Sequence, residues 1–427
     1  MKLIKIVLLC IIMIIGCKHK VLAQDTLKIT VEQAERQFLE KNLQLLAERY
    51  NIAIADAAIV QAKVLNNPTI GVGDINFWNP NAAEELEIAP VPFGTKLLFS
   101  VELEQVIRTA RKRKKLIDLE KVSKEIAIQE FESFLLSLKT ELRTILYETI
   151  YLQSYLDIIR MQHKAVDNLV EVYKINLNRG HITKGELIRL QSSLIELEAE
   201  ANEVQTELNN QYKELKVLLN IAPGTEILIL PATAITKSPD EISLVELLEM
   251  AKNSRPEFLL SDLEVKYHEK LLVYEKAQRS PDIALSLNYD RYGGIWKNFF
   301  GIGISLDIPV FDRNQGNIKI AKLGIERSSY NADYQKNTIK QEVVEFYNNY
   351  KINYNFYKKH SDSNFSEDLE NMFEVYTRNL LSRNINMLEF IDFMDAYRTT
   401  MHALLTAKKN LDTSFAELQF SVNNVIN

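Results

Sequence analysis

The sequence predicts a mainly α-helical protein that also has a small membrane-spanning β part. The first observation behind this prediction is a stretch from Arg111 to Asn178 that holds neither glycine nor proline. The second is a set of short segments in which apolar and small or polar residues alternate, as they do in strands with one apolar face. The third is that the second half of the chain repeats the pattern of the first, so the fold is expected to be internally duplicated.

Composition and charge exclude several classes of protein. Of the 427 residues 46% are hydrophobic, which is too many for a disordered chain. The chain has only 13 glycines and 10 prolines, fewer than a loop-rich enzyme would need. A net charge of −6 does not fit a nucleic-acid-binding protein. Because Cys10 and Cys17 are the only cysteines, the rest of the chain can form neither a disulfide framework nor a thiolate metal site.

Residues 1–23 are expected to be a signal peptide. Two lysines precede an apolar run at 6–15, which is too short to span a membrane as a helix. Two cleavage sites compete. Ile-Ile-Gly-Cys ending at Cys17 resembles a lipobox, in which that cysteine would be lipidated, and Val-Leu-Ala ending at Ala23 resembles an ordinary cleavage site. The charged residues between them favour the lipobox. No later apolar run is long enough for a transmembrane helix.

Residues 24–220 are expected to form the first repeat. It begins with a helix over 30–66, capped by Thr30 and ended by Pro68. Alternation then predicts strands at about 69–77 and 97–105. A long helix over about 108–178 follows, Gly180 ends it, and a return helix runs over 183–220.

The long helix carries one continuous stripe, at steps of four and three residues, that is typical of a coiled-coil seam. At about 1.5 Å per residue it would be roughly 100 Å long. Thr149 and His163 are its polar members. The stripe consists of Phe131, Leu135, Leu138, Leu142, Ile145, Thr149, Leu152, Leu156, Ile159, His163, Val166, Val170, Tyr173 and Leu177.

Residues 221–240 are expected to form a mid-height (equatorial) linker, and 241–427 the second repeat. Pro281 and Pro68 are 213 positions apart, and Glu389 and Glu186 are 203 apart, so the offset changes at the loop between the strands. The repeat is expected to contain a helix over 242–278, strands at 283–289 and 300–308, a long helix over 313–379 and a return helix over 387–422.

These lengths constrain the architecture. Each return helix is about half as long as a long helix, so stacked shorter helices must flank two long ones to bury their seams. Four strands with one apolar face suit a membrane β-barrel, but the smallest known barrels have about eight strands, so one chain cannot close one. Three chains of four strands each would supply a 12-stranded β-barrel, joined to a long α-helical coiled-coil barrel.

The duplicated unit resembles the TolC-type outer membrane efflux family over the whole mature chain. Arg255-Pro256-Glu257 resembles the Asn-Pro-Glu of that family, although Asn42-Leu43-Gln44 in the first repeat lacks the proline. The segment Ser305–Asn317 resembles the second strand-to-helix junction, especially in the heavy-metal (CzcC/CusC-like) branch. Arg179–Leu187 and Asn384–Asp392 resemble the two periplasmic tip turns, and the second lacks the usual glycine.

The resemblance implies a homotrimer in the bacterial outer membrane, contacting outer membrane lipid, with its helical tunnel in the periplasm. It implies a passive exit duct that docks a periplasmic adaptor (membrane fusion) protein and an inner-membrane pump of the RND type, for heavy-metal cations in its metal branch. No cofactor is implied. Two alternatives remain: a type I secretion conduit, which shares the fold, and a periplasmic structural coiled-coil protein. An enzyme is not expected, because no phosphate loop, G-x-S-x-G or H-E-x-x-H motif is present.

The resemblance also implies a gate at the tip turns. Threefold symmetry would turn one carboxylate into a ring that favours cations. The competing interpretation is that these residues are solvated charges at helix ends. The candidates are the acids Glu186, Glu389 and Asp392, with Arg179, Arg189 and Arg383 as partners.

Three further features have simpler interpretations. The basic run Arg111–Lys115 would lie near anionic lipid head groups or form a solvated helix start. His163 has no partner at ligand spacing, so no metal site is expected. The aromatic residues at the strand ends would be interfacial girdle residues or loop-tip aromatics, namely Trp78, Trp296, Tyr289 and Tyr292.

Overall fold

The computed structural model of the chain describes residues 26–76, 98–231, 237–291, 296, 298–361, 363–424 and 426. Contacts divide the chain into two compact units. Unit 1 draws on Met1–Leu46, Leu135–Leu248 and Glu342–Asn427, and unit 2 on Ala47–Phe134 and Glu249–Gln341.

Helices dominate the described residues. They are α2 (Val31–Lys41), α3 (Leu43–Lys63), α4 (Lys112–Asn178), α5 (Lys184–Leu218), the 3-10 helix η2 (Pro239–Glu241), α6 (Leu244–Ser254), α7 (Pro256–Gln278), α8 (Gln315–His360), α9 (Ser363–Leu381) and α10 (Met387–Val422). The strands are β1 (Thr26–Ile29), β2 (Thr69–Asn76), β3 (Leu98–Ile107), β4 (Glu226–Ile229), β5 (Ile283–Arg291) and β6 (Asn298–Leu306). Among the described helices, none combines the length and apolar character needed to cross a membrane.

The core of unit 1 is built by α4, α5, α9 and α10. Leu156, Ile159 and Val170 of the α4 seam are buried there, together with Leu190 of α5 and Phe390 of α10. The buried face of α4 is wider than the predicted seam, since it also takes in Leu146, Tyr155, Gln162 and Leu169. This follows from the packing of α4 against more than one neighbour, which requires a broader apolar face than a two-helix seam does.

Both predicted first helices are divided into two. Asn42 has extended backbone (ψ 118°) and separates α2 from α3, and its Oδ1 accepts a hydrogen bond from the N–H of Leu45 at 2.7 Å. Its amide also donates to the carbonyl of Leu218 at 2.9 Å. At the matching position, Arg255 separates α6 from α7, and Pro256 stands at the first position of α7. Proline suits that position because its missing N–H has no partner there in any case.

The second long helix is divided as well. Where one helix was expected over 313–379, α8 ends at His360 and α9 begins at Ser363. The last turn of α8 carries Lys358, Lys359 and His360, which favour the negative end of a helix.

The linker holds a strand that was not expected from the sequence to be part of a sheet. β4 pairs in parallel with β1, aligning Ile29 with Ile229. Both of these isoleucines are buried. The short pair therefore fastens the beginning of the described chain to the linker within unit 1.

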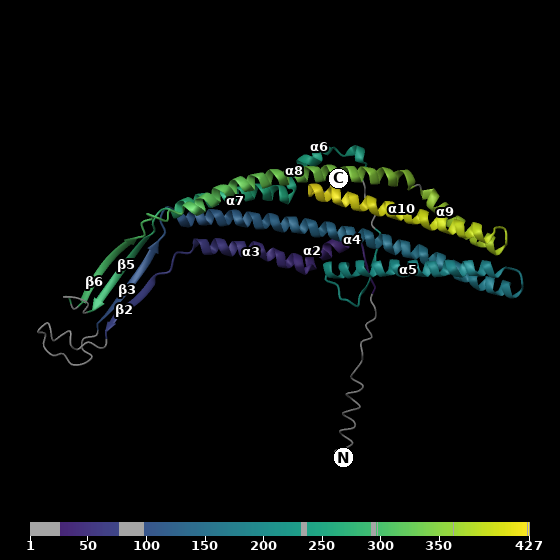
Figure 1. The fold of residues 1–427 in the computed structure, drawn as a ribbon, viewed down its shortest axis with the longest axis horizontal. Coiled ribbons are helices and arrows are strands. Elements are labelled where there is room, and N and C mark those ends of the chain that lie inside the picture. Colours follow the sequence, from purple (N-terminus) through teal and green to yellow (C-terminus); the bar gives the residue numbers. More distant parts are fainter. Residues whose placement is uncertain are drawn as a thin grey trace, which may run out of the picture. The chain divides into compact units, whose positions relative to one another are not determined.

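Unit 2 contains one antiparallel sheet of order β2-β3-β5-β6 (Figure 1). Residues directly opposite each other share a face, and the faces alternate along each strand. Leu103 is opposite Leu287, and Leu287 is opposite Ile302. Leu287 and Ile302 are 54% and 83% exposed, so the described residues leave this apolar face largely uncovered.

The other face of the sheet is mostly small and polar, although Val106 and Phe299 also lie on it. Its cross-strand neighbours include Glu102 opposite Asn288, and Ser286 opposite Gly303. A Cβ on Gly303 would come within 2.4 Å of the Ser286 hydroxyl, so a larger residue there would require the Ser286 side chain to move. The sheet therefore has one apolar and one polar face, as the alternation predicted.

Several expectations fall outside the described residues. These are the signal peptide, the lipidation of Cys17, and the placement of Trp78 and Tyr292. Of the other two aromatic candidates, Trp296 is exposed, and Tyr289 lies between Phe99 and Phe300 at ring-centroid distances of 5.9 Å and 4.8 Å.

Candidate gate at the hairpin tips

The first tip turn joins α4 to α5. Gly180 has a positive φ of 73°, a conformation that glycine adopts without steric cost. Its N–H donates to the carbonyl of Leu177 at 2.9 Å, and the N–H of His181 donates to that of Asn176 at 2.9 Å. This pair of bonds is the Schellman motif, which satisfies the last carbonyls of a helix.

The second tip turn joins α9 to α10 with the same geometry. The N–H of Arg383 donates to Leu380 at 3.1 Å, and that of Asn384 donates to Asn379 at 2.8 Å. Arg383 occupies the position of Gly180 and has a φ of 58°. A side chain in this left-handed region costs roughly 1–2 kcal/mol, so the turn is strained where the first is not.

The two turns are connected by one side chain. Nη2 of Arg383 donates a hydrogen bond to the carbonyl oxygen of His181 at 3.1 Å. Beneath the turns lie the buried side chains of Tyr173, Leu187 and Phe390. Burial raises the pKa of the Tyr173 phenol, Glu186 raises it further, and Arg383 opposes the rise. Arg383 is therefore the predicted site residue that joins the two helical hairpins, α4–α5 and α9–α10.

Glu186 and Glu389 occupy equivalent positions in capping boxes. The Thr183 N–H donates to Glu186 Oε2 at 2.7 Å, and the Thr183 hydroxyl accepts from the Glu186 N–H at 3.2 Å. The Asn386 N–H donates to Glu389 Oε2 at 3.1 Å, and its Oδ1 accepts from the Glu389 N–H at 2.9 Å. Both glutamates thus stabilise the starts of their return helices.

Electrostatics distinguishes Glu186. The backbone N–H and hydroxyl of Thr183 lower the pKa of its carboxyl below the ordinary glutamate value, and the charge of Arg383 lowers it further. Its carboxylate is therefore held in the charged form next to the strained turn.

The remaining candidates are not drawn together. Asp392, Arg179 and Arg189 are exposed, and none of them forms an ion pair within the part of the chain that the structure describes. No predicted acid–arginine salt bridge is formed at the tips of a single described chain; Arg383 instead bonds a backbone carbonyl.

Two residues that shape the tips were not proposed as site residues. Thr183 and Asn386 are the N-caps of α5 and α10. The spacing of Thr183 to Glu186 and of Asn386 to Glu389 is the sequence signal that could have identified both.

Away from the tips, in α4, Nε2 of His163 lies 3.2 Å from a carboxylate oxygen of Glu198, a contact that the spacing does not predict. No group of three metal-ligating side chains occurs among the described residues.

The fold is that of outer membrane channels, and the predicted resemblance to the TolC-type outer membrane efflux family is confirmed at the level of fold. The described architecture matches the structure of CusC at a TM-score of 0.72 and 15% identity, covering 92% of each chain. It matches the Campylobacter jejuni CmeC outer membrane channel at a TM-score of 0.74 and 14% identity, covering 92% of this chain and 85% of that one. These solved structures are channel proteins and not enzymes.

Sequence comparison adds one relative. The cobalt-zinc-cadmium resistance protein CzcC of Cupriavidus metallidurans is 33% identical over 73 residues. The matched segment is 17% of this chain and spans only 18% of that relative. No protein-family model matches the chain.

Proposed function

We propose that this chain is the outer membrane channel of a tripartite efflux system, a passive duct from an inner-membrane pump to the outside of the cell. The observation that carries the proposal is the four-stranded sheet, which exposes an apolar face with Val72, Leu287 and Ile302 and has a polar opposite face. An exposed apolar face of this kind suits lipid, and a polar face suits a water-filled lumen.

The open edges of the sheet support an oligomer. Among the described strands, β2 and β6 each pair on one side only. Unpaired edge strands invite pairing with another chain, and a barrel removes edges altogether. Joining β6 of one copy to β2 of the next would close a ring, and three copies of the four-stranded sheet give twelve strands. We therefore propose a homotrimer.

In this proposal the helical hairpins form the periplasmic tunnel, and their tips form its gate. The bond from Arg383 to His181 would hold the two hairpins of each chain together in the closed state. Glu186, Glu389 and Asp392 would form acidic rings, each present three times around the axis, with Arg179 and Arg189 at their rim. Conduction of this kind requires no catalytic group and no cofactor.

The proposed cargo rests on the sequence likeness to CzcC, and the proposed partners rest on the resemblance to the efflux family. The CzcC segment supports heavy-metal cations as cargo, because that relative is a cobalt-zinc-cadmium resistance protein. A periplasmic adaptor (membrane fusion) protein and an RND-type inner-membrane pump are proposed as partners on the resemblance to the TolC-type family. We further propose that 24–220 and 241–427 are duplicated repeats around the linker 221–240, and that residues 1–23 direct export, with lipidation at Cys17. A type I secretion conduit would share this fold, and the genes beside this one would distinguish the two.

The test is ion conductance of the purified protein in planar bilayers, with the oligomer mass measured in parallel. A trimer with small, cation-preferring conductance is expected. Arg383→Ala should raise that conductance, whereas the exposed Arg49→Ala, on α3, should not. A protein that never inserts and remains a monomer or dimer would overturn the proposal and favour a periplasmic coiled-coil protein.

A further inference from the structure

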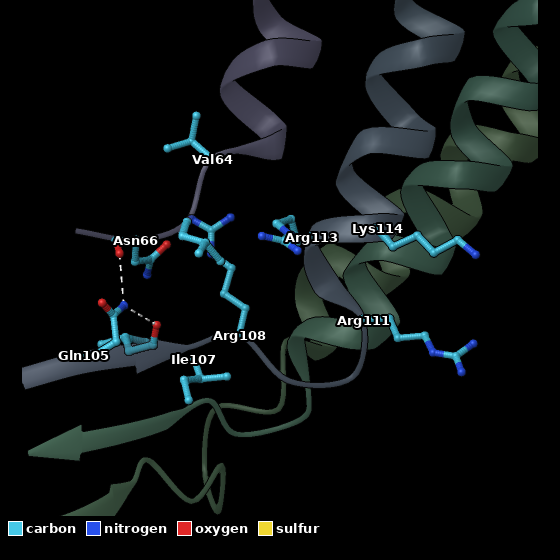
Figure 2. Close-up of a pocket in the computed structure, with 10 residues that line it drawn as sticks. Val64, Asn66, Gln105, Ile107, Arg108, Arg111, Arg113 and Lys114 are labelled. Carbon is cyan, nitrogen blue, oxygen red and sulfur yellow. Dashed lines mark hydrogen bonds between the residues drawn. The ribbon is translucent and has the colours of Figure 1, made fainter. Parts of the chain in front are cut away.

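A cavity of about 450 Å³ lies in unit 2, where α3 leads into β2 and β3 leads into α4 (Figure 2). Its polar lining is strongly basic, and its apolar lining is aliphatic. Figure 2 shows the Arg108 side chain extending from the end of β3 toward the segment with Val64 and Asn66. The lining residues are Val64, Leu65, Asn66, Gln105, Val106, Ile107, Arg108, Arg111, Arg113 and Lys114.

The positive charge of this cavity is only partly offset by the described residues, because Arg108 interacts electrostatically with the Asp282 carboxylate. Lys112 beside it is 5% exposed and forms an ion pair with Asp282 at 2.8 Å. By contrast, no described carboxylate pairs with Arg108, Arg113 or the other two lining cations. The first turn of α4 has no acidic residue, so the positive end of the helix dipole adds to the field. An anion with several acceptor oxygens would relieve this repulsion.

The backbone at the cavity is strained. Ala110 and Arg111 both have positive φ, 50° and 56°, although neither is glycine. Each costs roughly 1–2 kcal/mol in this conformation. Thr109 next to them is fixed by a hydrogen bond from its N–H to Asp282 at 2.8 Å. Strain of this kind is often found at ligand sites, where the surrounding structure holds it.

The cavity reaches the end of the apolar face of the sheet. Ile107 lines it and is opposite Ile283, on the same face of the sheet as the Leu103–Leu287 pair. Leu65 on the other side is 70% exposed. A ligand that fits both parts must carry an anionic head and an aliphatic tail.

We infer that this cavity binds the phosphate head group of an anionic phospholipid, with Arg108 and Arg113 on the phosphate oxygens and the acyl chain along Ile107. Guanidinium groups suit phosphate because they offer parallel N–H donors in a planar fork. The lipid source rests on the proposed membrane position of the sheet. Free phosphate shares the head-group chemistry but would leave the aliphatic lining uncovered.

The test is native mass spectrometry of the full-length protein, released from neutral detergent and titrated with phosphatidylglycerol, phosphatidylcholine or inorganic phosphate. The double variant Arg108→Gln with Arg113→Gln removes the two cavity charges. The control, Arg49→Gln with Lys340→Gln, removes two exposed cations of the same unit that lie outside the cavity. Phosphatidylglycerol should bind about tenfold more weakly to the cavity variant and unchanged to the control.

Several outcomes would overturn the inference. Equal weakening in both variants would show that only net charge matters, and equal binding of phosphatidylcholine would exclude an anionic head-group site. Displacement of the lipid by inorganic phosphate would assign the cavity to the free ion. Planar-bilayer conductance of the same variants tests the channel function independently of lipid binding. If the cavity variant conducts normally but binds phosphatidylglycerol as well as the control does, the lipid site is overturned and the proposed channel function stands.

Discussion

The guanidinium of Arg383 reaches the carbonyl of His181 from a backbone conformation that disfavours arginine. The equivalent position in the other turn is Gly180, which meets no such cost. The link between the hairpins is therefore supplied by the residue that also strains its turn. Substitution of Arg383 can separate the backbone strain from the hydrogen bond to His181. Glycine at this position removes both the strain and the bond, whereas alanine removes only the bond.

Arg383→Gly should stabilise the protein relative to Arg383→Ala by about 1 kcal/mol, because only glycine relieves the left-handed backbone. Both variants should conduct more than the unaltered protein, since both lack the bond to His181. Thermal unfolding and planar-bilayer conductance measure the two effects. If both variants conduct like the parent protein, Arg383 does not hold the gate.

Thr183→Ala should destabilise the start of α5 by about 1 kcal/mol, because it removes the side chain that caps the helix. Hydrogen exchange of the first turn of α5 should become faster, while exchange in the first turn of α10, capped by Asn386, should not change. Equal acceleration in both turns would mean that the substitution acts globally rather than on one cap.

Acidification should weaken the first tip turn through Glu186. Its pKa is lowered in the folded protein, so the stability that its charge provides is complete above the ordinary glutamate pKa of about 4.3 and is lost as the pH falls through the folded value. Glu186→Gln should therefore lose less stability than the parent protein between pH 6 and pH 3. Denaturant unfolding at both pH values tests this, and an identical loss in both proteins would contradict it.

Lys112→Met should destabilise unit 2 by about 3 kcal/mol, because it leaves Asp282 without the buried cation that pairs with it. Burial alone would raise the pKa of Asp282, but the bonds from Lys112 and from the Thr109 N–H bring it below the ordinary value. Lys174→Met is the control, since its pair with Glu171 is exposed and should contribute under about 1 kcal/mol. Similar losses in thermal unfolding would show that burial of the pair is unimportant.

Neighbouring residues on β5 offer a test of the two sheet faces. Leu287→Lys places a charge on the apolar face and should cost about 2–4 kcal/mol on insertion into a bilayer. Asn288→Lys places the same charge on the polar face, where it should allow insertion and reduce cation conductance. Reconstitution yield and conductance report both effects, and the proposed orientation fails if Asn288→Lys is the variant that blocks insertion.

Much of this fold was predictable because its signals are local and periodic. The absence of glycine and proline predicted a long helix over 108–178, and α4 spans Lys112–Asn178. Alternation predicted four strands near the observed bounds of β2, β3, β5 and β6. The helix breaks were harder to predict. Asn42 interrupts a helix because its side chain finds partners at Leu45 and Leu218, and the second of these is distant in sequence.

The sequence predicted where the residues of the candidate site lie in the chain's helices and turns, but it did not predict which of them contact each other. Glu186 and Glu389 are found at helix starts, as their place after the turns implied. Their capping partners follow from a short spacing rule, but the bond from Arg383 to His181 spans 202 positions. Likewise, the parallel pair of β1 and β4 joins segments 200 positions apart, and four-residue strands carry too little alternation to be recognised.

Unit 1 is assembled from distant segments of the chain, and this determines when the protein can fold. Its core needs α4 and α5 from the middle of the chain, and α9 and α10 from the end. On α4, Arg143 bonds both Glu35, near the beginning, and Gln419, near the end. Contacts between such distant segments form slowly, since a large loop must close first. An exported chain would therefore stay open until its last helix had arrived, and would need protection from aggregation until then.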